Sequence, residues 1–161
     1  MPVESRYDLV WSATDANGVL RTTAEKPSDV AIAAAGTKAV FAWTTPASVH
    51  WLLSTGETYA IETSPVIPTP PAVACNAKDC VVAYATSSGD LHAASFEIAH
   101  PYRVLSFVVN ASERREHAPQ VHALPTGQFL VSYDSDGYAL SDHRVGGRIV
   151  SVGPVKRRAV D

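Results

Sequence analysis

The sequence predicts an all-β fold made of repeated antiparallel units, and two observations support this prediction. A phrase recurs along the chain: an apolar strand, a short polar turn, and a second apolar strand that ends in an aromatic residue. The copies are residues 29–43, 71–84 and 119–133, with a partial copy at 7–11. The composition agrees, since 46% of the residues are hydrophobic, only 18% are charged, and 11 prolines and 9 glycines are available for turns. Because each repeated unit has to bury a face against the next, the repeat determines the fold class.

The spacing of the aromatic ends favours propeller blades. These ends are Trp11, Trp43, Tyr84 and Tyr133. The second and third intervals fall in the range of roughly 40–50 residues that a four-stranded blade occupies, whereas the first interval is shorter. Each copy holds two short strands and a tight turn, which is the hairpin of an antiparallel sheet. We therefore expect about three and a half units of antiparallel four-stranded β-propeller blades, with a β-sandwich as the second choice.

The individual strands follow from these hairpins and from the residues that separate them. The segment 65–71 contains four prolines and predicts a connector, since proline cannot pair inside a ladder. Residues 111–118 are the most polar stretch and predict a second connector. The predicted strands are 7–11, 19–23, 29–35, 38–43, 50–54, 58–62, 72–75, 80–85, 91–98, 103–109, 119–124, 128–133, 138–145 and 148–152. The predicted units of the single domain 1–161 are 1–26 (partial), 27–68, 69–116 and 117–153, with 154–161 as a tail or closing strand.

The partial first unit raises the question of ring closure. A closed propeller has about four blades or more and leaves no long sheet edge exposed. Three arrangements remain open: residues 154–160 pair into the first blade, the chain is part of a larger propeller, or two chains associate to complete one ring. We expect a fragment or a self-association rather than a closed monomer.

Charge and hydropathy exclude two classes of partner. The net charge is −3 and no basic stripe is present, so we expect no nucleic-acid surface. The basic cluster 156–158 lies at a terminus, where a solvated tail is the simpler interpretation. No apolar run approaches the ~20 residues that span a bilayer, and the first residues do not form a signal peptide.

The best copy of the phrase resembles a known family of repeats. Residues 119–133 carry proline and valine at the start, Gly127 before the second strand, and Phe-Leu-Val-Ser-Tyr at its end, and residues 144–147 read Arg-Val-Gly-Gly. This pattern is similar to the propeller repeats of secreted or surface-anchored bacterial proteins, notably myxobacterial ones. The resemblance implies a propeller fold and brings no catalytic motif. The chain departs from the family at His122, where the repeats have alanine, and at tyrosines that replace tryptophan.

Cys75 and Cys80 flank a four-residue turn between two predicted strands. Cross-strand neighbours at such a position can come within disulfide range. Free buried thiols are the alternative, and a redox or metal role is a third, although the spacing is not C-x-x-C and no two further ligands are near. The repeats that the chain resembles carry paired cysteines at this turn. A disulfide would indicate an oxidising compartment.

Two acidic turns resemble shortened calcium loops. Asp15 and Asn17, and likewise Asp134 and Asp136, each precede a glycine and offer oxygen atoms at alternate positions. The same residues also make the commonest hairpin turns, because they tolerate positive φ. We therefore expect turns, with calcium as the alternative and no other cofactor or metal.

Three further residues are candidates for ligand binding. Trp51 and Tyr59 could stack on a sugar, although strand aromatics more often pack in a core. His122 stands where the repeat has a small residue. The chain lacks a G-x-S-x-G elbow, a phosphate-binding loop and an H-E-x-x-H pair, so we expect no catalytic residue and no enzyme.

These observations together predict a non-enzymatic β-propeller module for binding or scaffolding in an extracellular or surface bacterial protein, with a protein or glycan as its partner. The alternatives are a lectin-like carbohydrate-binding propeller and a non-catalytic fragment of a propeller hydrolase. We expect the chain outside the cell or at its surface as part of a larger protein, and in the cytoplasm if the sequence is full length.

Overall fold

The computed structural model describes residues 7–12, 17–23, 26–54, 57–62, 70–137, 139 and 141–153, with the backbone alone for 7–12, 17–23 and 62. Within these ranges the chain is all-β and contains no helix, as the sequence predicts. The described part accordingly offers no helix that could cross a membrane.

Thirteen strands are present in the described part of the chain. They are β1 (Tyr7–Ser12), β2 (Asn17–Thr23), β3 (Ala31–Ala35), β4 (Lys38–Thr45), β5 (Ser48–Leu53), β6 (Thr58–Glu62), β7 (Ala72–Cys75), β8 (Asp79–Ala85), β9 (Leu91–Glu97), β10 (His100–Asn110), β11 (Arg115–Ala123), β12 (Phe129–Asp136) and β13 (His143–Val150).

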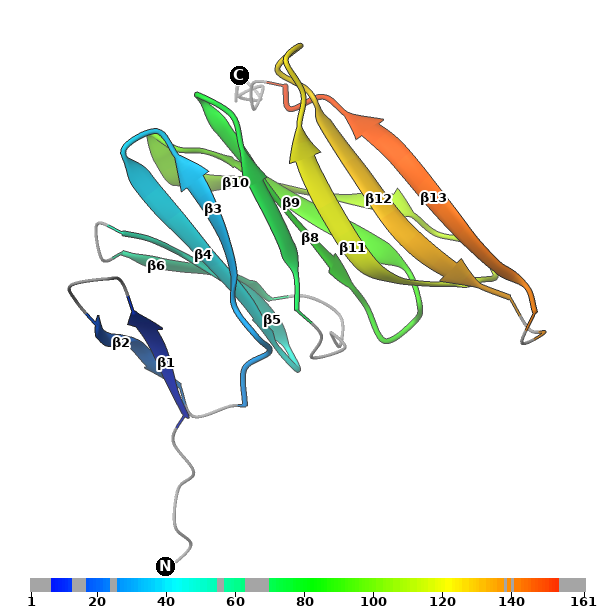
Figure 1. Ribbon diagram of the computed structural model, residues 1–161, viewed down its shortest axis with the longest axis horizontal. Coiled ribbons are helices and arrows are strands. Elements are labelled where there is room, and N and C mark those ends of the chain that lie inside the picture. The colour runs from blue at the N-terminus through cyan, green and yellow to red at the C-terminus, as the bar shows by residue number, and fades with distance from the viewer. Residues whose placement is uncertain are drawn as a thin grey trace, which may run out of the picture.

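The strands form four sheets, and every paired strand is antiparallel to its neighbour in sequence (Figure 1). The sheets are β1–β2, β3–β4–β5–β6, β7–β8–β9–β10 and β11–β12–β13. Short turns connect the strands because turn residues lie between the apolar halves of each hairpin. The repeated hairpin of the sequence thus becomes a repeated meander.

The three larger sheets lie one after another, face to face, and their first strands, β3, β7 and β11, are neighbours (Figure 1). β7 packs against β3 on one side and against β11 on the other. Two apolar cores fill the spaces between these three larger sheets. Trp51 and Phe96 lie in the core between the β3–β6 and β7–β10 sheets, and Leu91 and Phe129 lie in the core between the β7–β10 and β11–β13 sheets.

β8 shows why this sequence needs a layer on each side. Successive side chains of a strand point to opposite faces. Val82 and Tyr84 point into the first core, whereas Val81 and Ala83 point into the second. All seven residues of β8 are therefore buried. A strand with two covered faces has a continuous apolar run rather than an alternating pattern.

Two of the predicted boundaries that differ from the structure concern β11 and β13, and the first is the start of β11. The sequence placed residues 111–118 in a connector, but β11 begins at Arg115. Its fully buried Glu116 is partly satisfied within the protein: Oε1 accepts hydrogen bonds from Asn110 (2.8 Å) and Ser112 (2.6 Å), whereas Oε2 has no hydrogen-bond partner in the described residues. Polarity alone was a poor sign of a loop here.

The second difference is the last sheet. The sequence predicted two strands, 138–145 and 148–152, on either side of a glycine pair, but β13 is one continuous strand from His143 to Val150. Neither Gly146 nor Gly147 has a positive φ. Gly146 lies against the ring of Tyr133, and a Cβ there would stand 2.5 Å from the ring carbon Cζ. The glycine is needed for close packing and not for a turn. In the described residues this sheet therefore has three strands, not four.

Candidate binding site

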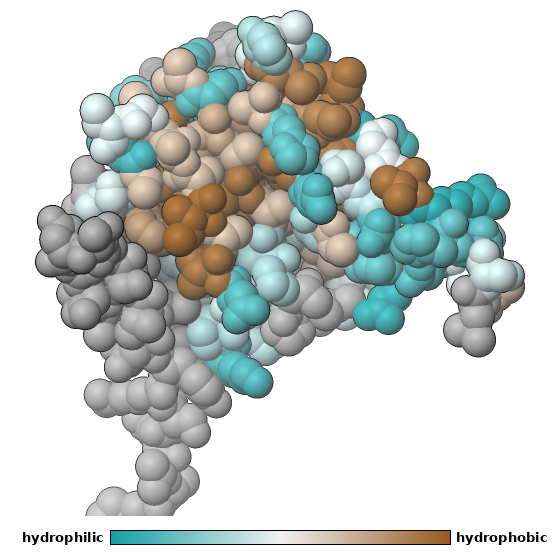
Figure 2. All heavy atoms as spheres, in the orientation of Figure 1, coloured by the Kyte–Doolittle hydropathy of each residue, from teal (hydrophilic) through white to brown (hydrophobic). Residues whose placement is uncertain are grey.

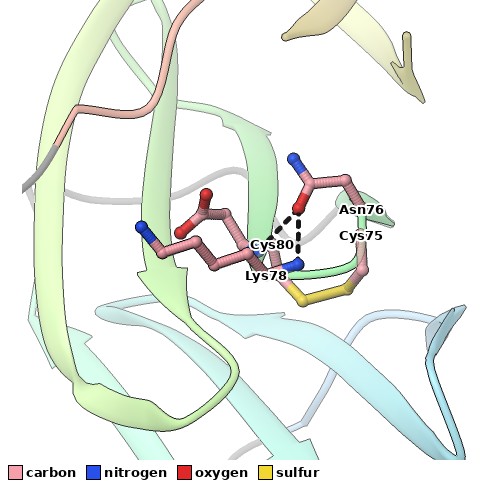
Figure 3. The surroundings of a disulfide bond; sticks show 5 residues. Cys75, Asn76, Lys78 and Cys80 are labelled. Carbon is pink, nitrogen blue, oxygen red and sulfur yellow. Dashed lines mark hydrogen bonds between the residues drawn. A yellow bond between two sulfur atoms is a disulfide. The ribbon is translucent and has the colours of Figure 1, made fainter. Parts of the chain in front are cut away.

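Cys75 and Cys80 form a disulfide, as one of the sequence interpretations held (Figure 3). The two residues are directly opposite each other on β7 and β8, and their Cα atoms are 4.1 Å apart. Oδ1 of Asn76 accepts hydrogen bonds from the backbone N–H groups of Lys78 (2.8 Å) and Asp79 (2.7 Å), which fixes the turn. The bond staples a hairpin, and Cys80 is fully buried. It is a structural feature rather than a reactive site.

The aromatic candidates are occupied in packing. The suggestion that Trp51 could receive a ligand is not supported, because its side chain is 0% exposed and stacks on Phe96 with ring centroids 5.1 Å apart. Tyr59 is half-buried, stacks on Trp51, and donates its hydroxyl to Glu57. His122 is exposed on β11, opposite Leu130, and is not among the residues that line the pocket described below.

The two predicted acidic turns differ in how far the structure describes them. Asp15 lies outside the described residues, and of Asn17 only the backbone is described, at the start of β2. Asp134 and Asp136 are not in a turn but on one face of β12. The described residues hold no group of three or more acidic, histidine or cysteine side chains suited to a metal ion.

A pocket of about 610 Å³ lies where the segment before β7 meets β11 and the end of β12. Its walls combine apolar and polar residues. The lining residues are Pro70, Pro71, Arg115, His117, Ala118, Pro119, Gln120 and Asp136. Its volume is within the roughly 300–1,000 Å³ of small-molecule sites.

The pocket owes its shape to an irregularity in β11. The pairing of β11 with β12 shifts register between His117 and Gln120. Ala118, within this bulge, has a φ of 47°, which is uncommon for a residue other than glycine. Pro119 follows it and is buried. A proline cannot donate to a ladder and is tolerated at such a bulge. The bulge thus separates the polar start of β11 from its second half and changes the direction of the side chains beside it.

Two histidines meet one carboxylate at the edge of the pocket. Asp136 lies 2.7 Å from Nε2 of His117 through Oδ2, and 2.8 Å from Nδ1 of His143 through Oδ1. The hydrogen bonds from His143 and then His117 lower the pKa of Asp136. The hydrogen bond with Asp136 raises the pKa of His143, and the charge of Asp134 adds to the effect. Asp136 is therefore held as a carboxylate that both rings can approach as donors.

Arg114 fixes the loop beside this cluster. Its Nη2 donates to the backbone oxygens of Asp142 (2.7 Å) and Ser135 (2.9 Å), its Nε donates to Oγ of Ser135 (2.9 Å), and its Nη1 pairs with the Asp142 carboxylate. The hydrogen bond from Arg114 lowers the pKa of Asp142. This clamp ties the start of β11 to Ser135 on β12 and to Asp142, the residue before β13.

The arrangement can hold a ligand that has an apolar part and a hydrogen-bonding part. Pro70 and Ala118 are exposed and offer apolar surface, while Arg115 and Gln120 are exposed and their side-chain donors make no hydrogen bond within the described residues. A guanidinium beside an apolar wall suits a carboxylate group on a partly apolar molecule.

Sequence reasoning missed most of these residues. Arg115 and His117 were assigned to a connector because the stretch around them is polar and precedes a proline. One signal was available: Asp134 and Asp136 alternate along a strand, so a hairpin returning at Gly137 brings His143 opposite Asp136. No protein-family model matches the sequence, and a search of curated proteins finds no match.

Proposed function

We propose that the chain is a non-enzymatic binding module whose sheets are blades of a β-propeller, and that its ligand occupies the pocket between the segment before β7 and β11. The observation that carries the proposal is the adjacency of β3, β7 and β11. Each is the first strand of its meander, and the later strands of each sheet extend away from it. Sheets that meet at their first strands and pack face to face have the arrangement of blades about an axis.

The position of the pocket supports a binding role. It opens beside two of these first strands, where loops and strand ends of neighbouring sheets converge. Binding sites are often found on loops that a rigid scaffold holds in place. The scaffold here is two filled cores and a disulfide.

The chemistry of the cluster favours binding over catalysis. Asp136 is shared by two histidines, and Arg114 is bound by Asp142 and Ser135, so these groups support the walls of the pocket. Arg115 and Gln120 remain for a ligand. A module of an extracellular or surface protein fits the disulfide, since such bonds persist in oxidising compartments.

A titration tests this proposal. ¹⁵N-labelled protein is titrated with a panel of short acidic peptides that carry proline or leucine beside the acidic residue. We expect at least one peptide to shift the amide signals of Arg115 to Gln120, and Arg115→Ala to weaken that binding tenfold or more. Arg103→Ala, an exposed arginine on β10 away from the pocket, is the matched control. Binding that survives Arg115→Ala, or no binding by any peptide, contradicts the proposed site.

A glycan is the second candidate ligand, and one observation favours it. Tyr102 on β10 is 62% exposed, with the Arg103 guanidinium 5.7 Å from the centre of its ring and His100 3.5 Å from its hydroxyl. An exposed aromatic ring between polar groups is suited to stacking on a sugar. Binding on a glycan array that Tyr102→Ala abolishes and Arg115→Ala leaves intact would favour this candidate.

A further inference from the structure

β13 is an outer strand with a regular edge, and no strand of the described residues pairs with that edge. Two other sheets have four strands, whereas in the described residues the β11–β13 sheet has three and ends at β13. β13 pairs with β12 over all eight residues without a register shift. It contains neither a proline nor a bulge, two devices by which proteins protect a sheet edge.

The backbone groups that face this edge can be assigned. The N–H of Gly137 donates to the carbonyl of Asp142 (2.8 Å), so these two residues form a hydrogen-bonded pair. Such pairs alternate along an antiparallel ladder with pairs that are not bonded to each other. Gly147 and the other odd-numbered residues of β13 are in the second class. Their N–H and C=O groups therefore point away from β12, toward the open edge.

The two exposed apolar side chains of β13 lie at equal distances on either side of Gly147. Val145 is 74% exposed and Ile149 is 63% exposed. They lie on the same face of the strand, two residues before and two residues after Gly147. In Figure 2 a small apolar group stands among hydrophilic side chains on the side of the molecule where β13 lies.

We propose that the edge of β13 is a self-association site, where β13 of a second copy of the chain pairs antiparallel about a two-fold axis at Gly147. Val145 then lies opposite Ile149 of the second copy, and the reverse pair forms on the other side of the axis. Apolar β-branched pairs of this kind stabilise antiparallel sheets. The outward N–H and C=O groups of Gly147 and Val145 gain partners. The two three-stranded sheets become one sheet across an isologous interface.

The positions of the two arginines on β13 favour a two-fold axis at Gly147 over an axis at the residue before or after it. An axis at Gly146 places Arg144 directly opposite Arg148 of the second copy, and an axis at Arg148 places that residue opposite itself. Like charges directly opposite each other are unfavourable in a sheet. With the axis at Gly147, Arg148 lies opposite a glycine and Arg144 lies opposite Val150. The absence of a side chain at Gly147 also allows the two backbones to approach on the axis.

The mass of the full chain in solution tests the pairing. Light scattering during gel filtration, from micromolar to millimolar protein, should give a mass that rises from the 17.1 kDa of one chain to twice that value. Gly147→Pro removes an N–H that makes no bond within the protein, and proline is tolerated at such an edge position. Val145→Lys adds a charge to the paired face beside Asp134, its neighbour on β12. Both variants should remain monomeric at concentrations where the parent chain is a dimer.

Amide hydrogen exchange separates this pairing from other modes of association. The amides of Val145, Gly147 and Ile149 should become protected as the concentration rises, whereas those of Gly146 and Arg148 should be protected throughout by β12. Ile32→Lys is the matched control, since Ile32 on β3 is also 63% exposed, and this variant should dimerise like the parent. A monomer at every concentration overturns the proposal. So does a dimer that persists in both β13 variants or lacks the alternating protection.

Discussion

Asp136 and His143 lie directly opposite each other on β12 and β13, with Oδ1 and Nδ1 2.8 Å apart. Cross-strand pairs are the unit of side-chain stabilisation in a sheet, and this pair joins the last two strands next to the pocket. His117 contacts the other oxygen of the same carboxylate at 2.7 Å. The pocket edge and the last strand are thus connected through one acidic side chain.

This pair predicts a pH window for stability. The pKa of His143 is raised by its hydrogen bond with Asp136, so its contribution is complete below the ordinary histidine value of about 6.5 and is lost as the pH rises through the raised value. The pKa of Asp136 is lowered by His143 and His117, so its contribution is present above about 3.9 and is lost as the pH falls through the lowered value. The pair should stabilise the fold most between about pH 4 and 6.5.

The measurement is the free energy of unfolding across pH for the parent chain and for His143→Gln. The difference between the two should be largest inside the window and should shrink as the pH rises through the raised pKa of His143. His92→Gln, at a histidine on β9 with a different environment, is the control and should not reproduce the profile. A difference that is constant with pH would contradict the assignment.

The disulfide closes a short loop, which predicts a moderate contribution. Cys75 and Cys80 are five positions apart, and the loop-closure relation gives a stabilisation of about 2 kcal/mol for a loop of this length. The Cys75→Ala/Cys80→Ala double variant should unfold at lower denaturant with a similar m-value. Reduction of the parent chain should produce a similar loss of stability. An unchanged midpoint after verified reduction would show that the Asn76 turn alone holds the hairpin.

The packing between the first two large sheets predicts a larger effect. Trp51 is 0% exposed and stacks on both Tyr59 and Phe96. Trp51→Ala should lower the free energy of unfolding by about 3–5 kcal/mol, because it removes a large buried side chain and leaves a cavity. Tyr102→Ala, at a 62% exposed aromatic, should cost far less. Equal losses would mean that Trp51 is accessible after all.

The hairpins could be predicted from the sequence because their determinants are local. The turn between Cys75 and Cys80 and the hairpin that ends near Trp43 each hold two apolar strands around a few turn residues, and the structure has both. The pocket could not be predicted in this way. Pro70, Arg115 and Asp136 meet only because β7 and β11 belong to sheets that pack together. Nothing in the local pattern around each residue specifies that packing.

The incorrect boundaries at β11 and β13 have a similar physical origin. The segment around Glu116 is polar, yet its buried carboxylate finds donors within the fold. The pair Gly146 and Gly147 has the composition of a turn, yet Gly146 serves the contact with Tyr133. In both places a contact that residue composition does not reveal overrides the local preference: the nearby donors Asn110 and Ser112 for Glu116, and the cross-strand ring of Tyr133 for Gly146.

The contact between Gly146 and Tyr133 gives the last prediction. A Cβ at position 146 would lie 2.5 Å from Cζ and 2.6 Å from Cε2 of Tyr133, whose side chain is 8% exposed and held in the second core. Gly146→Ala should therefore destabilise the fold by roughly 1–3 kcal/mol through overpacking. The backbone at this position has no positive φ, so alanine can adopt its conformation and the loss comes from the side-chain contact. Gly153→Ala is the matched control, because nothing lies within 4 Å of a Cβ at that position, and its unfolding midpoint should be nearly unchanged. Tyr133→Leu in the Gly146→Ala background should recover part of the loss, since the ring carbons that clash are removed. If Gly146→Ala and Gly153→Ala unfold at the same denaturant concentration, β13 does not pack on Tyr133 as described.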